Sequence, residues 1–138
     1  MTTNPSAPRP VHRVDIQMRF ADTDAMGHLN NGSYVVYAET GRLHFLRTLG
    51  GAASSLILAH LSIDFRRQVR FGESVAIETW VERIGTTSVT LRQAILADGA
   101  VAAEVTSVVV SFDYDANRAV PWSDESRSAL MAHLRSER

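Results

Sequence analysis

Hydrophobic and polar residues alternate near the start of the sequence and again through most of its second half. Within residues 14–20 the apolar positions are Val14, Ile16, Met18 and Phe20, with polar residues between them. A period of two is typical of a strand with one buried face, so we expect a strand over residues 14–20. The same reasoning predicts four more strands, over residues 56–65, 74–84, 87–96 and 101–113.

Short turn sequences separate the four later strands. Gly72-Glu73, Gly85-Thr86 and Asp98-Gly99 stand between successive apolar runs. Asp-Gly between two such runs is a strong signal for a two-residue hairpin. We therefore expect these strands to be antiparallel neighbours.

A long helix is predicted over residues 33–49. Its apolar residues lie along one stripe and extend beyond it: Tyr34, Ala38, Gly41 and Phe45, with Val36 and Leu43 outside. A helix that is hydrophobic over most of its surface is expected to be enclosed. Its candidate caps are Asn30, Asn31 and Ser33, and Gly50-Gly51 supplies the stop.

Two further features complete the predicted elements. Glu39 and Arg42 lie three residues apart on the long helix, and a partly buried structural ion pair is favoured over a catalytic role. After the turn residues 115–117, Pro121 and Ser123 introduce a short amphipathic helix whose apolar residues are Leu130, Met131 and Leu134.

The order of elements predicts an α+β fold. An antiparallel sheet must cover its apolar face, and the long helix is the available cover. We therefore expect a five-stranded antiparallel sheet that curls around a central helix.

Length and composition narrow the classes of protein. The 138 residues suit one domain, which we place at 12–138 after a flexible tail over 1–11. With a net charge of -1, the protein has no overall electrostatic attraction for nucleic acid or for an anionic membrane surface. The absence of cysteine excludes disulfides and thiol nucleophiles. No run reaches the roughly 20 apolar residues of a membrane span, and the polar, Pro-rich start is no secretory signal, so we expect a cytoplasmic location.

The candidate chemistry lies just before the long helix, in the stretch ADTDAMGHLNNGSY. Read as a calcium loop from Asp22, it has Met26 in the fifth position and Ser33 in the twelfth, where a glutamate is required. A zinc site at Asp22, Asp24 and His28 has no second histidine nearby, so it is disfavoured. The sequence also lacks a G-x-S-x-G elbow and a Gly-rich phosphate loop.

A carboxylate at the start of a helix remains as the candidate. The first turn of a helix offers unpaired N–H groups and a partial positive charge, which can stabilise a carbonyl oxygen under attack. Asp24 could attack that carbonyl or deprotonate a water that does so. These parts suit acyl transfer or hydrolysis, but Asp and Asn before a helix are most often caps, and both interpretations remain open.

The sequence RFADTDAMGHLNNGSYVVYAETGR resembles the signature of the hotdog-fold thioesterases of the 4-hydroxybenzoyl-CoA thioesterase class. The segment FRRQVRFGES is similar to the family's strand end and Gly turn, so the resemblance covers roughly residues 12–113. It implies a hotdog fold, in which a sheet wraps a central helix. It also implies hydrolysis of acyl-CoA thioesters without a metal or organic cofactor.

The resemblance assigns roles to single residues. Asp24 matches the catalytic aspartate, and the backbone N–H near Asn31 matches the donor that polarises the thioester carbonyl. His28 matches the histidine that takes part in the similar plant acyl-carrier-protein thioesterases. Those enzymes carry an asparagine where this chain has Met26, so their full polar network is not reproduced.

Further residues are expected around the substrate. Asn30, like Asp22, is expected to support or cap the site, and Tyr34 is expected to pack over it. Arg66, Arg67 and Arg70 could meet the phosphates of coenzyme A, although a solvated strand edge explains them too.

Family members are dimers or dimers of dimers, which implies a homodimer or homotetramer with part of each pocket from the second chain. An acyl carrier protein remains an alternative carrier of the substrate. The rival functions are a hotdog hydratase or dehydratase, and a non-catalytic acyl-binding protein.

Overall fold

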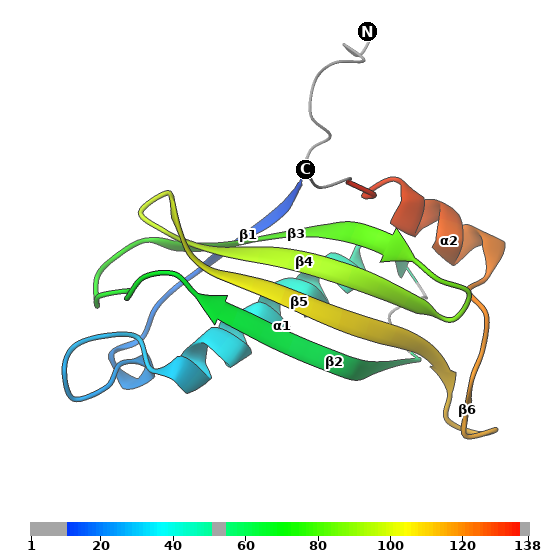
Figure 1. Cartoon of the computed structure of the whole chain (residues 1–138), viewed down its shortest axis with the longest axis horizontal. Coiled ribbons are helices and arrows are strands. Elements are labelled where there is room, and N and C mark those ends of the chain that lie inside the picture. Colours follow the sequence, from blue (N-terminus) through cyan, green and yellow to red (C-terminus); the bar gives the residue numbers. More distant parts are fainter. Residues whose placement is uncertain (1–10, 51–54, 136–138) are drawn as a thin grey trace, which may run out of the picture.

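One long helix lies across the concave face of a curved antiparallel sheet (Figure 1). This computed structural model describes residues 11–50 and 55–135. The strand order in the sheet is β1-β3-β4-β5-β2, and a short β6 also pairs with β5. The elements are β1 (His12–Ile16), η1 (Phe20–Asp22), α1 (Asn31–Arg47), β2 (Leu56–Phe65), β3 (Val75–Ile84), β4 (Ser88–Ala97), β5 (Ala100–Asp113), β6 (Arg118–Ala119) and α2 (Asp124–Met131).

Tight turns join β3, β4 and β5 into a meander. Val75, the first residue of β3, pairs with Ala97, the last residue of β4. Ala97 also pairs with Ala100, the first residue of β5, so the ends of the three antiparallel strands are aligned. Asp98 and Gly99 both have positive φ, of 49° and 82°, as the predicted two-residue hairpin requires. The predicted α+β architecture is confirmed, and β6 is an addition that the pattern did not indicate.

The apolar stripe of α1 fills the space between helix and sheet. Tyr34, Ala38 and Phe45 are at most 3% exposed. Gly41 allows the closest approach, because a Cβ there would overlap Ile77 Cγ2 and lie 2.9 Å from Ile77 Cβ on β3. The helix backbone therefore rests directly on β3.

Three expectations about the first half of the chain were wrong. The first strand ends at Ile16, and Phe20 is 76% exposed in η1, because the chain turns there towards α1. Val36 and Leu43 are 57% and 45% exposed, so within one chain α1 is covered on one side only. Arg42 is buried while Glu39 faces solvent, and they form no ion pair in the described part of the chain.

The limits of α1 and the start of α2 are close to those predicted. α1 ends at Arg47, shortly before Gly50, whose φ is +76°. Gly51, the second predicted stop residue, lies outside the described residues. Residues 1–10 of the expected tail also lie outside them. Ser123 caps α2 as predicted, by accepting a hydrogen bond from Ser126 N.

The predicted apolar face of the short helix was correct only in part. Leu130 is fully buried, but Met131 is 52% exposed. Leu134 lies beyond the helix, where it forms a bridge with Val81. No helix in residues 11–50 and 55–135 is long and apolar enough to cross a membrane.

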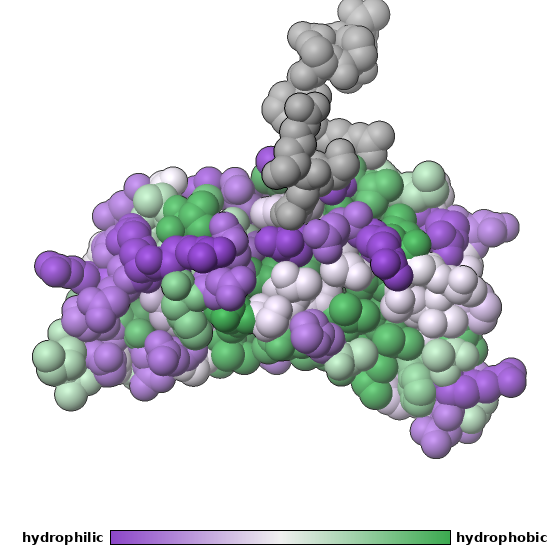
Figure 2. Space-filling view, in the orientation of Figure 1, coloured by the Kyte–Doolittle hydropathy of each residue, from purple (hydrophilic) through white to green (hydrophobic). Residues whose placement is uncertain are grey.

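The outer face of the sheet, which is turned away from α1, carries a mixture of hydrophilic and hydrophobic side chains (Figure 2). Its small apolar cluster consists of Ala76, Ala94 and Leu96, with Trp80 packed against it. The main core lies on the opposite, concave face, against α1.

Candidate active site

The loop that carries Asp24 is a small closed turn in front of α1. Asp24 N donates to His28 O at 2.7 Å, and Gly27 N donates to Asp24 O at 3.2 Å. Gly27 has φ +79°, a conformation that favours glycine. The base of the loop is fixed by the bridge between Thr23 and Leu29.

A neighbouring segment, residues 69–71, holds the same loop from the other side. Leu29 N donates to Val69 O at 2.7 Å, and Phe71 N donates to Gly27 O at 3.1 Å. Residues distant in sequence therefore fix the loop in place before any substrate arrives.

The two carboxylate oxygens of Asp24 have different surroundings. Oδ1 accepts hydrogen bonds from Met26 N at 2.8 Å and from His28 N at 3.1 Å. These bonds lower the pKa of the Asp24 carboxyl, so it is ionised at neutral pH. Oδ2 has no hydrogen-bond partner among the described residues. One oxygen therefore orients the group, and the other is free to react.

The start of α1 leaves one N–H group unused. Asn30 is the N-cap: its side chain accepts from Gly32 N at 2.9 Å, and its carbonyl accepts from Ser33 N at 2.8 Å. The N–H of Asn31, the first helical residue, has no acceptor among the described residues. Because it lies at the positive end of the helix, it is suited to hold a carbonyl oxygen.

A cavity of about 260 Å³ joins these groups. It is lined by Asp24, His28, Leu29, Asn31, Tyr34, Phe65, Arg66, Arg67 and Gln68. Six of the residues selected from the sequence therefore meet at one place, while Asn30 and Arg70 do not line the cavity. Three lining residues were not anticipated, Leu29, Phe65 and Gln68.

The apolar wall of the cavity is built from two aromatic rings. Tyr34 of α1 and Phe65 of β2 meet edge to face, with ring centroids 5.0 Å apart. Burial raises the pKa of the Tyr34 hydroxyl, which donates a long hydrogen bond of 3.4 Å to Arg67 O. The alternation over β2 marked Phe65 as a strand residue, but only the pairing of β2 with β5 brings it to α1.

The three arginines differ in their partners. Arg66 Nη2 lies 3.0 Å from Glu104 Oε2, and Arg67 Nη2 lies 2.9 Å from Glu73 Oε2. Arg67 also donates to Ala97 O, so it holds its own segment against the end of β4. The guanidinium of Arg70 is exposed and forms no ion pair within residues 11–50 and 55–135.

Asp22 is buried behind the loop and makes no contribution to the cavity lining. Hydrogen bonds from Arg19, Tyr37 and the Arg19 backbone lower the pKa of its carboxyl to about 2. The bond from Tyr37 Oη to Asp22 Oδ2 is 2.6 Å long. Burial and this bond raise the pKa of the Tyr37 hydroxyl.

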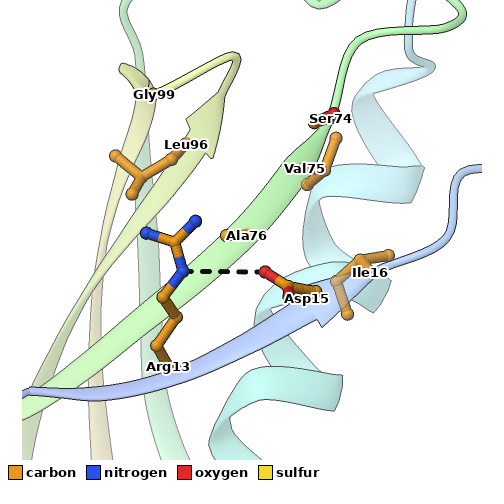
Figure 3. Close-up of a pocket in the computed structure, with 8 residues that line it drawn as sticks. All are labelled: Arg13, Asp15, Ile16, Ser74, Val75, Ala76, Leu96 and Gly99. Carbon is orange, nitrogen blue, oxygen red and sulfur yellow. Dashed lines mark ion pairs between the residues drawn. The ribbon is translucent and has the colours of Figure 1, made fainter.

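A second cavity, of about 340 Å³, lies along β1 and β3 near the turn between β4 and β5 (Figure 3). Arg13 and Asp15 project into the same region and form an ion pair of 3.6 Å. Arg13 also lies 3.8 Å from Glu78. The positive charge of Arg13 is thus balanced by the carboxylates of Asp15 and Glu78. None of the candidate site residues selected from the sequence lines this cavity.

The described residues include no group of three or more His, Asp or Glu side chains placed to hold a metal ion. The zinc interpretation of Asp22, Asp24 and His28 has no support in the geometry, because Asp22 is turned towards Arg19 and Tyr37.

A curved antiparallel sheet around one helix, with an acidic loop at the helix start, is the arrangement of the hotdog-fold thioesterases. The sequence matches the model of the Thioesterase-like superfamily over residues 18–130, and the chain belongs to this family of thioester hydrolases.

A curated relative with a thioesterase description agrees with this assignment. The chain is 28% identical over 79 residues to the "Putative acyl-CoA thioesterase YneP" of Bacillus subtilis (strain 168). That match covers 52% of this chain and only 57% of YneP. The match to the uncharacterized protein YsmA of the same organism is 26% identical and covers 84% of this chain and 82% of YsmA.

Solved structures with the same fold cover nearly the whole chain. One, described as a predicted thioesterase from Bacillus stearothermophilus, has a TM-score of 0.85 and 31% identity and covers 94% of this chain and 100% of its own. Another, a thioesterase from Thermus thermophilus complexed with coenzyme A and Zn, has a TM-score of 0.82 and 25% identity. Its match covers 91% of this chain and 94% of its own.

Proposed function

We propose that this protein hydrolyses acyl-CoA thioesters to a free acid and coenzyme A. The observation that carries the proposal is the meeting of Asp24 and Asn31 in one cavity, which supplies an ionised carboxylate and an unused helix-start N–H. The description of YneP and the coenzyme A in the Thermus structure support the choice of thioester.

The reaction begins with the thioester carbonyl oxygen at the N–H of Asn31. In the general-base route, Asp24 Oδ2 takes a proton from water as the water oxygen bonds to the carbonyl carbon. In the nucleophilic route, Oδ2 itself bonds to that carbon, and water later cleaves the mixed anhydride. In both routes the C–S bond breaks and the electron pair leaves on sulfur. The thiolate then takes a proton to become the thiol of coenzyme A, from the Asp24 carboxyl in the general-base route and from solvent water in the nucleophilic route, where hydrolysis of the anhydride returns a proton to solvent. The negative charge on the carbonyl oxygen is stabilised by Asn31 N–H and the positive end of α1.

The other lining residues would hold the substrate. His28, whose own N–H orients Asp24, lines the cavity and would orient the carbonyl or the attacking water. Tyr34 and Phe65 form the apolar wall against which the acyl group would lie. Asn30 would serve the site through its cap of α1 rather than by touching the substrate.

The arginines would meet the phosphates of coenzyme A. Arg70 is the strongest candidate, because its guanidinium is exposed and forms no ion pair within the described residues. Arg66 and Arg67 would have to share their charge with Glu104 and Glu73.

The test is thioester hydrolysis followed with a thiol reagent across acyl-CoA esters of different chain length, with aromatic acyl groups and with acyl carrier protein as carrier. We expect turnover of at least one acyl-CoA. Saturable binding of acyl-CoA without thiol release would contradict the proposal and favour a binding protein. Hydration of an enoyl-CoA without thiol release would favour a hydratase.

A further inference from the structure

A buried hydrogen bond connects α1 to Asp22, which directly precedes the loop that contains Asp24. Asp22 is 7% exposed and Tyr37 is 4% exposed, and they lie 15 residues apart in the chain. Their 2.6 Å bond joins η1, which ends at Asp22, to the second turn of α1. Neither side chain lines the cavity.

Both oxygens of the Asp22 carboxylate accept hydrogen bonds from within the protein. Oδ2 accepts from Tyr37 Oη and from Arg19 N at 3.0 Å, and Oδ1 accepts from Arg19 Nη2 at 2.9 Å. Because a carboxylate with three donors has little left to offer a substrate, its contribution to the site is positional.

The backbone of Asp22 holds the start of α1 as well. Its carbonyl oxygen accepts from Asn30 N at 2.9 Å and from Ser33 Oγ at 2.8 Å. These two residues flank Asn31, whose N–H is the proposed carbonyl donor. Asp22 therefore contacts the N-cap of α1, Asn30, and two residues of the helix itself, Ser33 and Tyr37.

Asp24 follows Asp22 after a single residue. Any shift of Asp22 relative to α1 would change the position of the Asp24 carboxylate relative to the N–H of Asn31. Displacement of reacting groups by about 1 Å can cost about a hundredfold in rate.

We propose that Tyr37 and Asp22 are a positioning pair that fixes the Asp24 carboxylate against the start of α1 for thioester hydrolysis. This inference rests on the proposed function, since it assigns the pair a role in that reaction. It concerns residues that touch neither the substrate nor the reacting atoms.

The first test is Tyr37→Phe, which removes the hydroxyl and keeps the ring. We expect kcat to fall about tenfold or more while KM changes less than about threefold, because the ground-state contacts to the substrate are kept and only the reacting geometry is lost. Tyr114→Phe is the matched control: it removes an exposed hydroxyl that donates to Leu56 O, far from the loop in sequence. The control should keep the wild-type kcat.

Substitutions of Asp22 provide the second test. Asp22→Asn keeps an acceptor for the Tyr37 hydroxyl and should retain more of kcat than Asp22→Ala. In the double variant Asp22→Ala with Tyr37→Phe, the second substitution should add little, since both remove the same bond. Additive losses, or a Tyr37→Phe enzyme with the kcat of Tyr114→Phe, would overturn the proposal.

Hydrogen exchange tests the geometry independently of turnover. The amide of Asn30, which donates to Asp22 O, should exchange faster in Tyr37→Phe and at the wild-type rate in Tyr114→Phe. Unchanged exchange would refute the positioning role even if kcat fell. If the wild type hydrolyses no thioester, the proposed function fails, and the exchange experiment still decides whether this bond holds the loop.

Discussion

Asp24 illustrates how one side chain can be both fixed and available. Its Oδ1 is held by two backbone N–H groups within the loop, whereas Oδ2 has no partner in the described residues. The N-cap of α1 is Asn30, so Asp24 is not needed to begin the helix. A change at Asp24 can therefore test chemistry with little effect on folding.

The first prediction concerns Asp24→Asn. The amide oxygen can accept the same two backbone bonds, but the group loses its charge and its basicity. We expect hydrolysis to fall by roughly two orders of magnitude or more, with a melting temperature close to that of the wild type.

Asp15→Asn is the control for Asp24→Asn, because Asp15 is an exposed aspartate of β1 that lies outside the candidate active site. It should leave steady-state turnover unchanged. A folded Asp24→Asn enzyme with near wild-type turnover would refute the mechanism.

The second prediction concerns His28→Ala. The backbone N–H of residue 28 still supports Asp24 Oδ1 in this variant, so the loop should remain folded. Only the imidazole in the cavity is lost. We expect turnover to fall by less than for Asp24→Asn, since an orienting group contributes less than the roughly hundred- to ten-thousand-fold of a general acid or base. Steady-state kinetics with the best acyl-CoA would measure this, and an unchanged kcat would remove the His28 side chain from the site.

At the scale of elements, α1 is positioned by the contact of Gly41 with β3. The third prediction is that Gly41→Ala lowers the free energy of unfolding by about 1–3 kcal/mol, because the added methyl group overlaps Ile77 and cannot be accommodated without a shift of the helix. Denaturant titration would measure the change. Gly32→Ala is the control: its added Cβ would lie 3.5 Å from Asn30 Oδ1, an ordinary contact, so stability should not fall.

The C-terminal segment after α2 packs back onto β1, β3 and α1. Val81 N donates to His133 O at 3.0 Å, and the rings of His12 and His133 both contact Phe45 edge to face. Burial lowers the pKa of both histidines, and the nearby charges of His133 and His44 lower that of His12 further. The folded state therefore favours neutral imidazoles at this junction.

The fourth prediction follows from the sign of these pKa shifts. Because the unfolded chain binds protons more readily than these two histidines do in the fold, stability is fully present above pH 6.5 and falls as the pH decreases below it. We expect His133→Gln to flatten this pH dependence of the unfolding free energy. The His133→Gln and wild-type curves should differ mainly below about pH 6.5, and the same pH dependence in both proteins would contradict the prediction.

At the scale of the whole molecule, β1 and β2 form the two edges of the sheet. β2 is ten residues long, and its Ile57 and Leu58 are 40% and 44% exposed. Val36 and Leu43 of α1 are exposed as well. An apolar edge strand with unpaired backbone groups is a common site of strand pairing between chains.

The fifth prediction is a homodimer or larger assembly joined through β2. Light scattering at micromolar concentration should give at least twice the 15.2 kDa of one chain. Leu58→Arg should shift the assembly towards the monomer, while Val101→Arg, at a comparably exposed position near the β4–β5 turn, should not. A wild-type protein that scatters as a compact monomer would exclude the edge-to-edge assembly.

The sequence by itself determined the features that depend on neighbouring residues. Alternation predicted β2, β3, β4 and β5, and Asp98-Gly99 predicted the hairpin between the last two, because side-chain direction and turn geometry are set locally. The choice of Asp24, His28 and Asn31 came from a single short stretch, and these residues do line one cavity.

Only the tertiary structure decided which distant groups meet. Burial of Arg42 away from Glu39, the ion pair between Arg66 and Glu104, and the contact of Phe65 with Tyr34 depend on how β2, β5 and α1 pack. The bond between Asp22 and Tyr37 also joins two separate elements. Periodicity assigns a residue to a face of its own element, but contacts between elements depend on strand register and helix placement, which the whole core sets.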